Sequence, residues 1–324
     1  MPGRSYPMPA ALALGIAASF FFAFTFVLNR SMDLGGGSWV WSASLRFVYM
    51  APLLAAILLI RGGGRMATVL ASVRKNLIAW IVWSTTGFGI FYSGICLASA
   101  QGPSWLVAAT WQLTIVAGAL LTPLFGRLVV TAAGTRRQRQ PLPHRQLAFS
   151  TLILAGVALV QFGEARNLPR TSALLGLGFV LVAAFAYPLG NRKMMELCGG
   201  ELDTTQRVFG MTLCSLPFWF LVVAGGLVTK APLGSGQAFQ VLVVALFSGI
   251  VATLLFFKAT ELAFDDLHRL AGIESTQAGE LVFTLAGGLL FFGDRSPSAL
   301  GFLGLALVVA GMVANGLTAP NRGR

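Results

Sequence analysis

Long apolar runs are the feature of this sequence that most restricts its fold. Ten runs of 17 to 23 residues hold 200 of the 324 residues and contain almost no charge. A helix needs about 20 largely apolar residues to cross the ~30 Å hydrocarbon layer of a membrane, so each run is predicted to be one membrane-spanning helix. The runs are Ala10–Leu28, Trp39–Ile60, Leu77–Leu97, Trp105–Phe125, Leu147–Gly163, Ala173–Gly190, Val208–Val228, Phe239–Phe257, Leu270–Phe292 and Ala299–Leu317.

The same runs exclude other architectures. Their apolar residues are continuous and do not alternate, which excludes a membrane barrel of strands, and in lipid a helix is then the structure that satisfies its own backbone. Charged residues make up 10% of the chain, whereas a soluble domain carries about 25%. The expected fold class is therefore an all-α integral membrane protein.

The basic residues indicate the orientation of these helices. The net charge is +12, but the basic residues stand singly between the runs and do not gather on one face, so no nucleic-acid partner is expected. With the amino terminus inside, 17 of the 23 Lys and Arg residues fall in inside segments and five in outside loops. The positive-inside rule then predicts two cytoplasmic termini in a cell (plasma or inner) membrane. The longest connection, the Arg- and Gln-rich loop Gly126–Gln146, leaves no room for an extramembrane domain.

The two halves of the chain resemble each other. Asn29-Arg30-Ser31-Met32 closes the first run and Asn191-Arg192-Lys193-Met194 closes the sixth, each after a Phe-Ala-aromatic triplet. At an offset of 165 residues, Gln112 pairs with Gln277. The matches keep their order over five runs, which favours a repeat over a coincidence of apolar residues. Asn29 and Asn191 are expected to cap their helices, with paired gates as the alternative.

Because each repeat holds an odd number of helices, the two repeats are predicted to have opposite orientations in the membrane. Inverted repeats are typical of secondary transporters, whose substrate site lies near the midplane between the halves. The expected organisation is a cytoplasmic N-terminus (1–9), a first five-helix repeat (10–163), an extracytoplasmic linker (164–172), a second five-helix repeat (173–317) and a cytoplasmic C-terminus (318–324).

Three segments resemble the drug/metabolite transporter superfamily. Residues 274–294 resemble its ninth helix, with Asp294 in the place of an acidic residue that commonly follows a Leu/Phe-Gly pair. Arg46-Phe47 resembles the Arg-Phe near the start of its second helix, and residues 304–311 resemble its Gly-rich last helix. Within the superfamily, the chain from about Ala10 to Leu317 resembles the multidrug resistance efflux transporter family, which has two fused five-helix repeats.

The resemblance implies export of small organic molecules or metabolites, without a resident cofactor. One departure limits the mechanism it implies. The small multidrug resistance proteins exchange protons for cationic drugs at a glutamate in their first helix, but neither Ala10–Leu28 nor Ala173–Gly190 contains an acidic residue. Exchange of protons for cationic drugs therefore cannot be assigned to this chain from a glutamate at the matching position.

Ionisable and amide side chains inside the membrane are costly, so they are candidate site residues. Glu280 lies near the middle of its run and is expected to couple protons or to balance a cationic substrate; a structural glutamate is the alternative. Glu274 lies near the cytoplasmic end, where headgroups or Arg269 are expected to solvate it. Gln277 and its repeat partner Gln112 are expected to line a central cavity, with an interhelical hydrogen bond as the alternative.

Two further residues complete the candidate site. Arg46 is expected to extend its side chain to the outer headgroups, with gating or attraction of an anionic group as the alternative. Trp111 is expected either to line the cavity as a flat aromatic surface or simply to pack. The three cysteines show no metal-binding or disulfide spacing, so no metal and no catalytic residue are predicted.

Small residues recur on one face of two runs. Gly156 and Gly163 are seven residues apart, as are Gly304 and Gly311. Glycines at this spacing let helices approach closely. We expect them to serve helix packing.

The sequence therefore predicts a secondary active exporter that works by alternating access, with a small organic substrate, protons as a candidate coupling ion, and a monomer or homodimer in the lipid bilayer. It lacks a Walker-type phosphate loop, so ATP hydrolysis is not expected. One alternative is a non-transporting structural or regulatory membrane protein. The other, a membrane-embedded enzyme, is less favoured because His144 and His268 both fall in loops.

Overall fold

The computed structural model describes residues 8–62, 64–131, 134–139, 142, 144–164, 167–262, 273 and 275–317. These residues are mostly helical, with one pair of short strands. In chain order the elements are α1 (Met8–Leu34), α2 (Trp39–Ile60), α3 (Gly64–Lys75), α4 (Leu77–Ser84), η1 (Thr85–Ile90), α5 (Phe91–Ser99), α6 (Ser104–Trp111), α7 (Leu113–Leu121), η2 (Thr122–Leu124), β1 (Gly126–Thr131), β2 (Gly134–Arg139), α8 (His144–Glu164), α9 (Arg170–Cys198), α10 (Thr204–Val228), α11 (Gln237–Val243), η3 (Val244–Ala252), α12 (Thr253–Leu262), α14 (Ala278–Phe291) and α15 (Ala299–Leu317).

Local sequence signals set several helix ends. Ser38 precedes α2, and its hydroxyl accepts a hydrogen bond from a backbone amide of the first turn. Asp203 and Gln206 form a reciprocal capping box at the start of α10. Gly199 ends α9 in the left-handed region at φ 54°, which glycine adopts without a steric penalty.

Eight helical stretches of the described residues are long and apolar enough to cross a membrane, judged by length and composition. They are Pro9–Leu34, Trp39–Ile60, Leu77–Ser99, Ser104–Leu124, Leu147–Glu164, Arg170–Cys198, Thr204–Val228 and Gln237–Phe256. The last two predicted runs contain shorter apolar helices, Ala278–Phe291 and Ala299–Asn315. A total of ten spans therefore stays a prediction.

Large apolar side chains cover the outside of the bundle. Ile60 is 86% exposed, Val228 84% and Phe291 77%. A soluble monomer rarely exposes an apolar surface of this extent, whereas hydrocarbon is the natural surrounding of such side chains.

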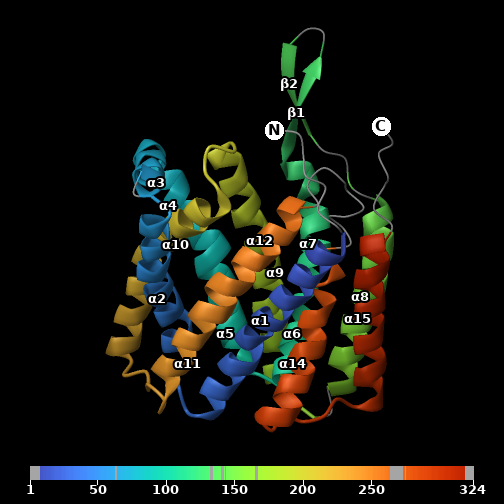
Figure 1. Ribbon diagram of the computed structural model, residues 1–324. Coiled ribbons are helices and arrows are strands. Elements are labelled where there is room, and N and C mark those ends of the chain that lie inside the picture. The colour runs from blue at the N-terminus through green and yellow to red at the C-terminus, as the bar shows by residue number, and fades with distance from the viewer. Residues whose placement is uncertain are drawn as a thin grey trace.

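α1 begins and α15 finishes at the same end of the bundle, from which the strands β1 and β2 project (Figure 1). We call this the hairpin end and the opposite one the far end. The strands pair antiparallel, with Gly126 opposite Arg139 and Thr131 opposite Gly134. The hairpin lies within the connection Gly126–Gln146 that was predicted as a loop, where the β-branched run at residues 129–131 favours strand pairing. The predicted all-α fold class is confirmed for the rest of the described residues.

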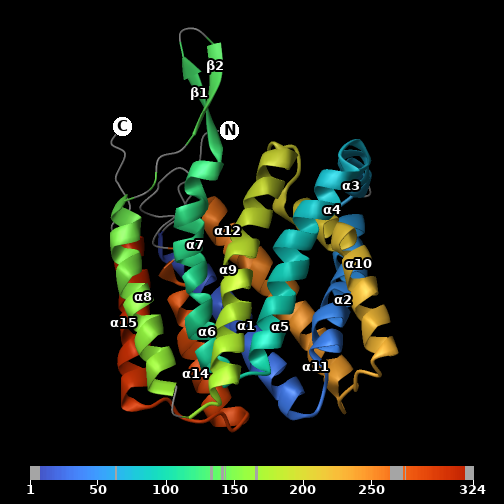
Figure 2. The same cartoon turned by 180° about the vertical axis from the view of Figure 1, so that it is seen from behind.

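The helices form two lobes that exchange their first helices. α1 packs against η3, α12 and α14, which all belong to the second half of the chain. The first helix of the second half, α9, packs against α4, η1, α5, α6 and α7 of the first half. Figure 2 shows α9 beside α5 and α7. We call these assemblies the α1 lobe (α1, α11, η3, α12, α14) and the α9 lobe (α4, η1, α5, α6, α7, α9).

Two helix pairs flank the lobes: α2 packs on α10, and α8 packs on α15 (Figure 1). In the second pair, a Cβ added to Gly304 would lie 2.6 Å from the backbone oxygen of Gly156. Only glycine permits this approach of the two backbones. The prediction that these glycines serve packing is confirmed.

Asn29 and Asn191 do not cap their helices, so that expectation is wrong. α1 and α9 both continue for more than a turn beyond them. The charged residues that follow Asn29 stay helical because they pair along the helix: Arg30 lies 3.1 Å from the carboxylate of Asp33, a spacing that stabilises helices. The apolar run thus ends before α1 does.

Candidate functional site

A cavity lies between the two lobes. About 860 Å³ of space there is not filled by protein atoms, and part of it is open to the surroundings. Both lobes and the α2–α10 pair supply its walls. The lining consists of the aromatic residues Phe22, Phe26, Phe47, Phe88, Phe91, Trp111 and Tyr187, the other apolar residues Met50, Ile95, Val208 and Gly249, and the polar residues Thr25, Arg46, Thr114, Asn191, Ser248, Thr253, Gln277 and Glu280.

Irregular helix segments form much of this wall. The helix of the fourth run breaks at Gln112, between α6 and α7, and the ninth breaks at Thr276-Gln277, just before α14. The third and eighth runs each contain a π-helical segment, η1 and η3. Such segments are frequent at functional sites, and broken helices line the binding sites of many transporters. Two helices of each half of the chain thus depart from regular geometry around one cavity.

Glu280 is the acidic residue of the cavity. It lies in the first turn of α14 and is 5% exposed. Its backbone amide donates to the Gln277 carbonyl, but its carboxylate makes neither a hydrogen bond nor an ion pair with any described residue. The amino-terminal end of a helix favours a negative charge nearby. The carboxylate is therefore buried, next to open space, and without a polar partner among the described residues.

Arg46 is the basic residue of the cavity, and it does not reach the membrane surface as expected. It is 8% exposed, and its guanidinium lies 4.2 Å from the centre of the Tyr92 ring. It donates to the hydroxyls of Thr25 at 3.3 Å and Ser248 at 3.4 Å. The expectation of a headgroup-bound arginine is wrong because the ring and hydroxyls of three neighbouring helices hold the guanidinium inside the bundle.

Three rings form an aromatic wall on the side of the α9 lobe. The Phe91 ring lies 5.0 Å from the Trp111 ring and 4.7 Å from the Tyr187 ring, measured between centroids. Trp111 and Tyr187 meet edge to face at 5.6 Å. Such clusters offer flat apolar surfaces with a preference for aromatic or cationic groups.

The structure brings together four of the six residues singled out from the sequence: Arg46, Trp111, Gln277 and Glu280 all line the cavity. Gln112 does not. It is 1% exposed, and its Nε2 donates to the Ala108 carbonyl one turn earlier, 3.1 Å away. Glu274 lies outside the described residues.

Sequence reasoning missed the hydroxyl residues of the cavity. Thr25 and Ser248 bond to each other across the interface of α1 and η3, and Thr253 lies one turn further along. Their signal in the sequence is weak, because Ser and Thr in membrane helices usually bond to their own backbone. Only the folded arrangement shows that they surround Arg46.

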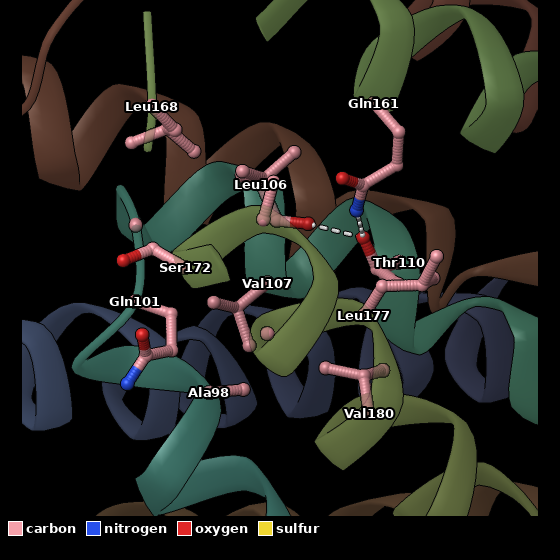
Figure 3. A pocket seen from close by; sticks show the side chains of 13 residues that line it. Ala98, Gln101, Leu106, Val107, Thr110, Gln161, Leu168, Ser172, Leu177 and Val180 are labelled. Carbon is pink, nitrogen blue, oxygen red and sulfur yellow. Dashed lines mark hydrogen bonds between the residues drawn. The ribbon is translucent and has the colours of Figure 1, made fainter. Parts of the chain in front are cut away.

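A smaller pocket of about 250 Å³ lies beside the cavity, between α5, α6, α8 and α9 (Figure 3). Gln161 Nε2 donates to the Thr110 hydroxyl at 2.8 Å, and that hydroxyl donates to the Leu106 carbonyl at 2.7 Å. Among the described residues, no charged side chain lines it. Its central polar groups satisfy one another, so it serves packing.

Polar contacts join the two lobes at the far end. Asp294, after α14, accepts from the Ser104 backbone amide at 2.8 Å and from the Ser104 hydroxyl. The Trp105 indole donates to the Arg295 carbonyl at 2.8 Å. These bonds join the start of α6, in the α9 lobe, to the loop after α14, in the α1 lobe.

The described residues contain no cluster of three His, Cys, Asp or Glu side chains that would hold a metal ion. The polar groups of the central cavity, by contrast, suit an organic ligand. They combine hydroxyls, amides, one guanidinium and one carboxylate with seven aromatic rings.

Comparison with known proteins gives concordant matches over nearly the whole chain. The profile of the EmrE family of multidrug resistance efflux transporters matches residues 10–320. The uncharacterized protein YjlA of Bacillus subtilis (strain 168) is 48% identical over 303 residues, which cover 94% of this chain and 93% of YjlA.

An uncharacterized 42.1 kDa protein of Shouchella clausii is also 48% identical, over 87% of this chain and 73% of its own length. One protein crystal structure is similar with a TM-score of 0.61 at 13% identity, covering 97% of this chain and 99% of the other. At that identity the likeness concerns the fold alone.

Proposed function

The chain belongs to the EmrE family of multidrug resistance efflux transporters, and from this premise we propose that it is a secondary exporter working by alternating access through the cavity between the α1 and α9 lobes. Membership in a transporter family implies a role in moving a substrate and not in converting it. The substrate would be a small organic molecule, in keeping with the size and polarity of the cavity.

The observation that carries the proposal is the buried Glu280 carboxylate, to which no side chain of the described residues is bonded. Burial of an unpaired charge costs several kcal/mol unless a ligand or proton compensates it. An unpaired buried carboxylate can be retained in a protein when binding of a ligand or a proton offsets the cost of its burial. Here the carboxylate borders a cavity whose walls come from both lobes.

Ten spans, both termini in the cytoplasm, and two inverted repeats at 10–163 and 173–317 complete the proposed architecture. The exchange of α1 and α9 between the lobes supports a two-fold relation between the halves. The positive charges of the connections favour the hairpin end as the cytoplasmic side. With the far end closed by Asp294 and Ser104, the cavity would open towards the cytoplasm.

Transport would then proceed by exchange at Glu280. A proton or a cationic group of the substrate neutralises the carboxylate in turn, so that the two compete for one site. Outward opening requires the Ser104–Asp294 and Trp105–Arg295 contacts to break, after which the substrate leaves and a proton from outside replaces it. Protons thus drive export.

The test is a flux assay on purified protein in liposomes, with a pH gradient and a panel of cationic, anionic and zwitterionic aromatic molecules. Ser104→Cys with Asp294→Cys allows the far end to be locked by a short, reducible thiol cross-linker. The native cysteines Cys96, Cys198 and Cys214 are buried, so the protein without the two substitutions serves as the control. Alternating access predicts that cross-linking stops flux and that reduction restores it.

Two results would overturn the proposal. One is the absence of flux above protein-free liposomes for every member of the panel. The other is undiminished flux through protein that mass spectrometry shows to be fully cross-linked between positions 104 and 294.

A further inference from the structure

The described lining of the cavity contains one positive and one negative side chain, and the two do not form an ion pair with each other. Arg46 and Glu280 both line it, and each is more than nine-tenths buried. Neither forms an ion pair with a described residue. This arrangement bears on which substrate the proposed exporter takes, and the inference below rests on that proposed function.

Arg46 has donors to spare. A guanidinium carries five N–H donors, and the described acceptors are two hydroxyl oxygens at 3.3 Å and 3.4 Å. Nε has no hydrogen-bond partner. One face of the group rests on the Tyr92 ring, which leaves its edge for a ligand. A planar carboxylate, bound through two parallel hydrogen bonds, is the natural complement of that edge.

Glu280 offers the opposite chemistry. An ionised carboxylate is an acceptor with two oxygens, and no described side chain donates to it. An ammonium group of a ligand would supply both the missing charge and the missing donors. Such charge-assisted bonds are about twice as strong as neutral ones.

The space around these two charges is aromatic. Tyr187 lines the same cavity as Arg46 and Glu280, and its ring is part of the wall that it forms with Phe91 and Trp111. A ligand that contacts both charged side chains must therefore lie against this flat, apolar wall. An aromatic or apolar body suits this position.

We propose that the cavity binds a zwitterion with an aromatic or apolar body, its anionic group on Arg46 and its cationic group on Glu280. Such a ligand compensates both buried charges at once. A simple cation would leave Arg46 unpaired and would meet its like charge, and a simple anion would meet the same penalty at Glu280. The cavity therefore selects against the singly charged drugs that a lone glutamate would accept.

The test compares probes with similar rings and different charges. Phenylalanine and 4-(2-aminoethyl)benzoate are zwitterions, phenethylamine is a cation, and 3-phenylpropionate is an anion. Binding to the purified protein is measured by calorimetry at neutral pH. We expect at least one zwitterion to bind about tenfold or more tightly than the cation and the anion.

Variants assign the two ends. Arg46→Gln is expected to abolish the preference for the zwitterion over phenethylamine. Glu280→Gln is expected to abolish the preference for the zwitterion over 3-phenylpropionate. Glu164→Gln removes a buried carboxylate outside the cavity and should leave the preference unchanged. Arg46→Lys keeps the charge without the two parallel bonds and should give an intermediate preference. The wild-type comparison stands even where a variant fails to fold.

The inference is overturned if phenethylamine binds as tightly as both zwitterions, or if none of the four probes binds. Flux separates this failure from failure of the proposed function. If the cation is transported and neither zwitterion is, the proposed substrate class is wrong and the proposed exporter function stands. If no molecule of the panel is transported, both proposals are wrong.

Discussion

The central cavity and the α8–α15 pair each contain a buried glutamate, and the two glutamates differ in whether their carboxylates are hydrogen-bonded. Glu164, at the end of α8, is 2% exposed, and its carboxylate accepts from the Ser298 backbone amide at 3.1 Å and from Asn167 Nδ2 at 2.9 Å. Glu280 is 5% exposed, and its carboxylate accepts no hydrogen bond from the part of the chain that the structure describes. The first carboxylate borders helices in backbone contact, and the second borders open space.

This difference teaches that burial of a charge does not by itself indicate function. A buried acceptor that is fully hydrogen-bonded is part of the structure. A buried acceptor that lacks partners and faces a cavity carries an uncompensated desolvation free energy, which a bound ligand can offset. In this protein the two cases lie in one chain, so substitutions can test them side by side.

The largest expected loss of stability comes from adding bulk to the α8–α15 pair. In Gly304→Leu the new Cβ would lie 2.6 Å from the Gly156 backbone oxygen, so the helices must separate. We expect a loss of about 3 kcal/mol in the free energy of unfolding, measured by denaturation in micelles. Gly225→Leu, at a position with open space around it, should change stability by less than about 0.5 kcal/mol. Equal losses would refute the close contact.

Bulk added to the cavity should act on transport instead. Thr114 lines the cavity, so Thr114→Phe would fill part of it. We expect flux to fall about tenfold, while unfolding free energy changes by less than about 1 kcal/mol. Thr151→Phe, on the exposed side of α8, is the control and should transport normally. Normal flux in Thr114→Phe would show that substrate does not pass this wall.

Removing the charge of the structural glutamate should cost less. Glu164→Gln keeps one acceptor for the Ser298 amide but loses the charge that strengthens both bonds. We expect a loss of about 1 kcal/mol in unfolding free energy and normal flux per folded molecule. A wild-type melting curve would show that these bonds contribute nothing to stability.

The smallest effects should separate the two glutamines of the helix breaks. Gln277 lines the cavity, whereas the Gln112 amide turns back on its own helix. Gln277→Ala should lower flux about two- to fivefold through loss of one hydrogen bond to substrate. Gln112→Ala should leave flux unchanged. A larger loss of flux in Gln112→Ala than in Gln277→Ala would instead place the substrate site at the helix break between α6 and α7.

Local patterns predicted much of this fold. Apolar runs of sufficient length located eight candidate spans, and glycines seven residues apart located the α8–α15 contact. Both features depend on residues close together in the sequence. For the same reason Glu280 and Gln277 could be selected as polar residues in a hydrophobic run.

Features that depend on distant partners were beyond the sequence. Arg46 is long enough to reach either the headgroups or the bundle interior, and Tyr92 and Ser248, which hold it inside, become its neighbours only after folding. The exchange of α1 and α9 between the lobes leaves no periodic signal. The repeat predicted equal places for Gln112 and Gln277, but it carries no information on side-chain direction.

The most direct test of the central claim is gradient-driven flux in liposomes with the matched variants Glu280→Gln and Glu164→Gln. Both remove one buried carboxylate and keep the side-chain shape. Export coupled at the cavity predicts that Glu280→Gln loses flux about tenfold or more and no longer responds to the pH gradient, while Glu164→Gln keeps both. Normal flux and normal pH response in Glu280→Gln would contradict the account.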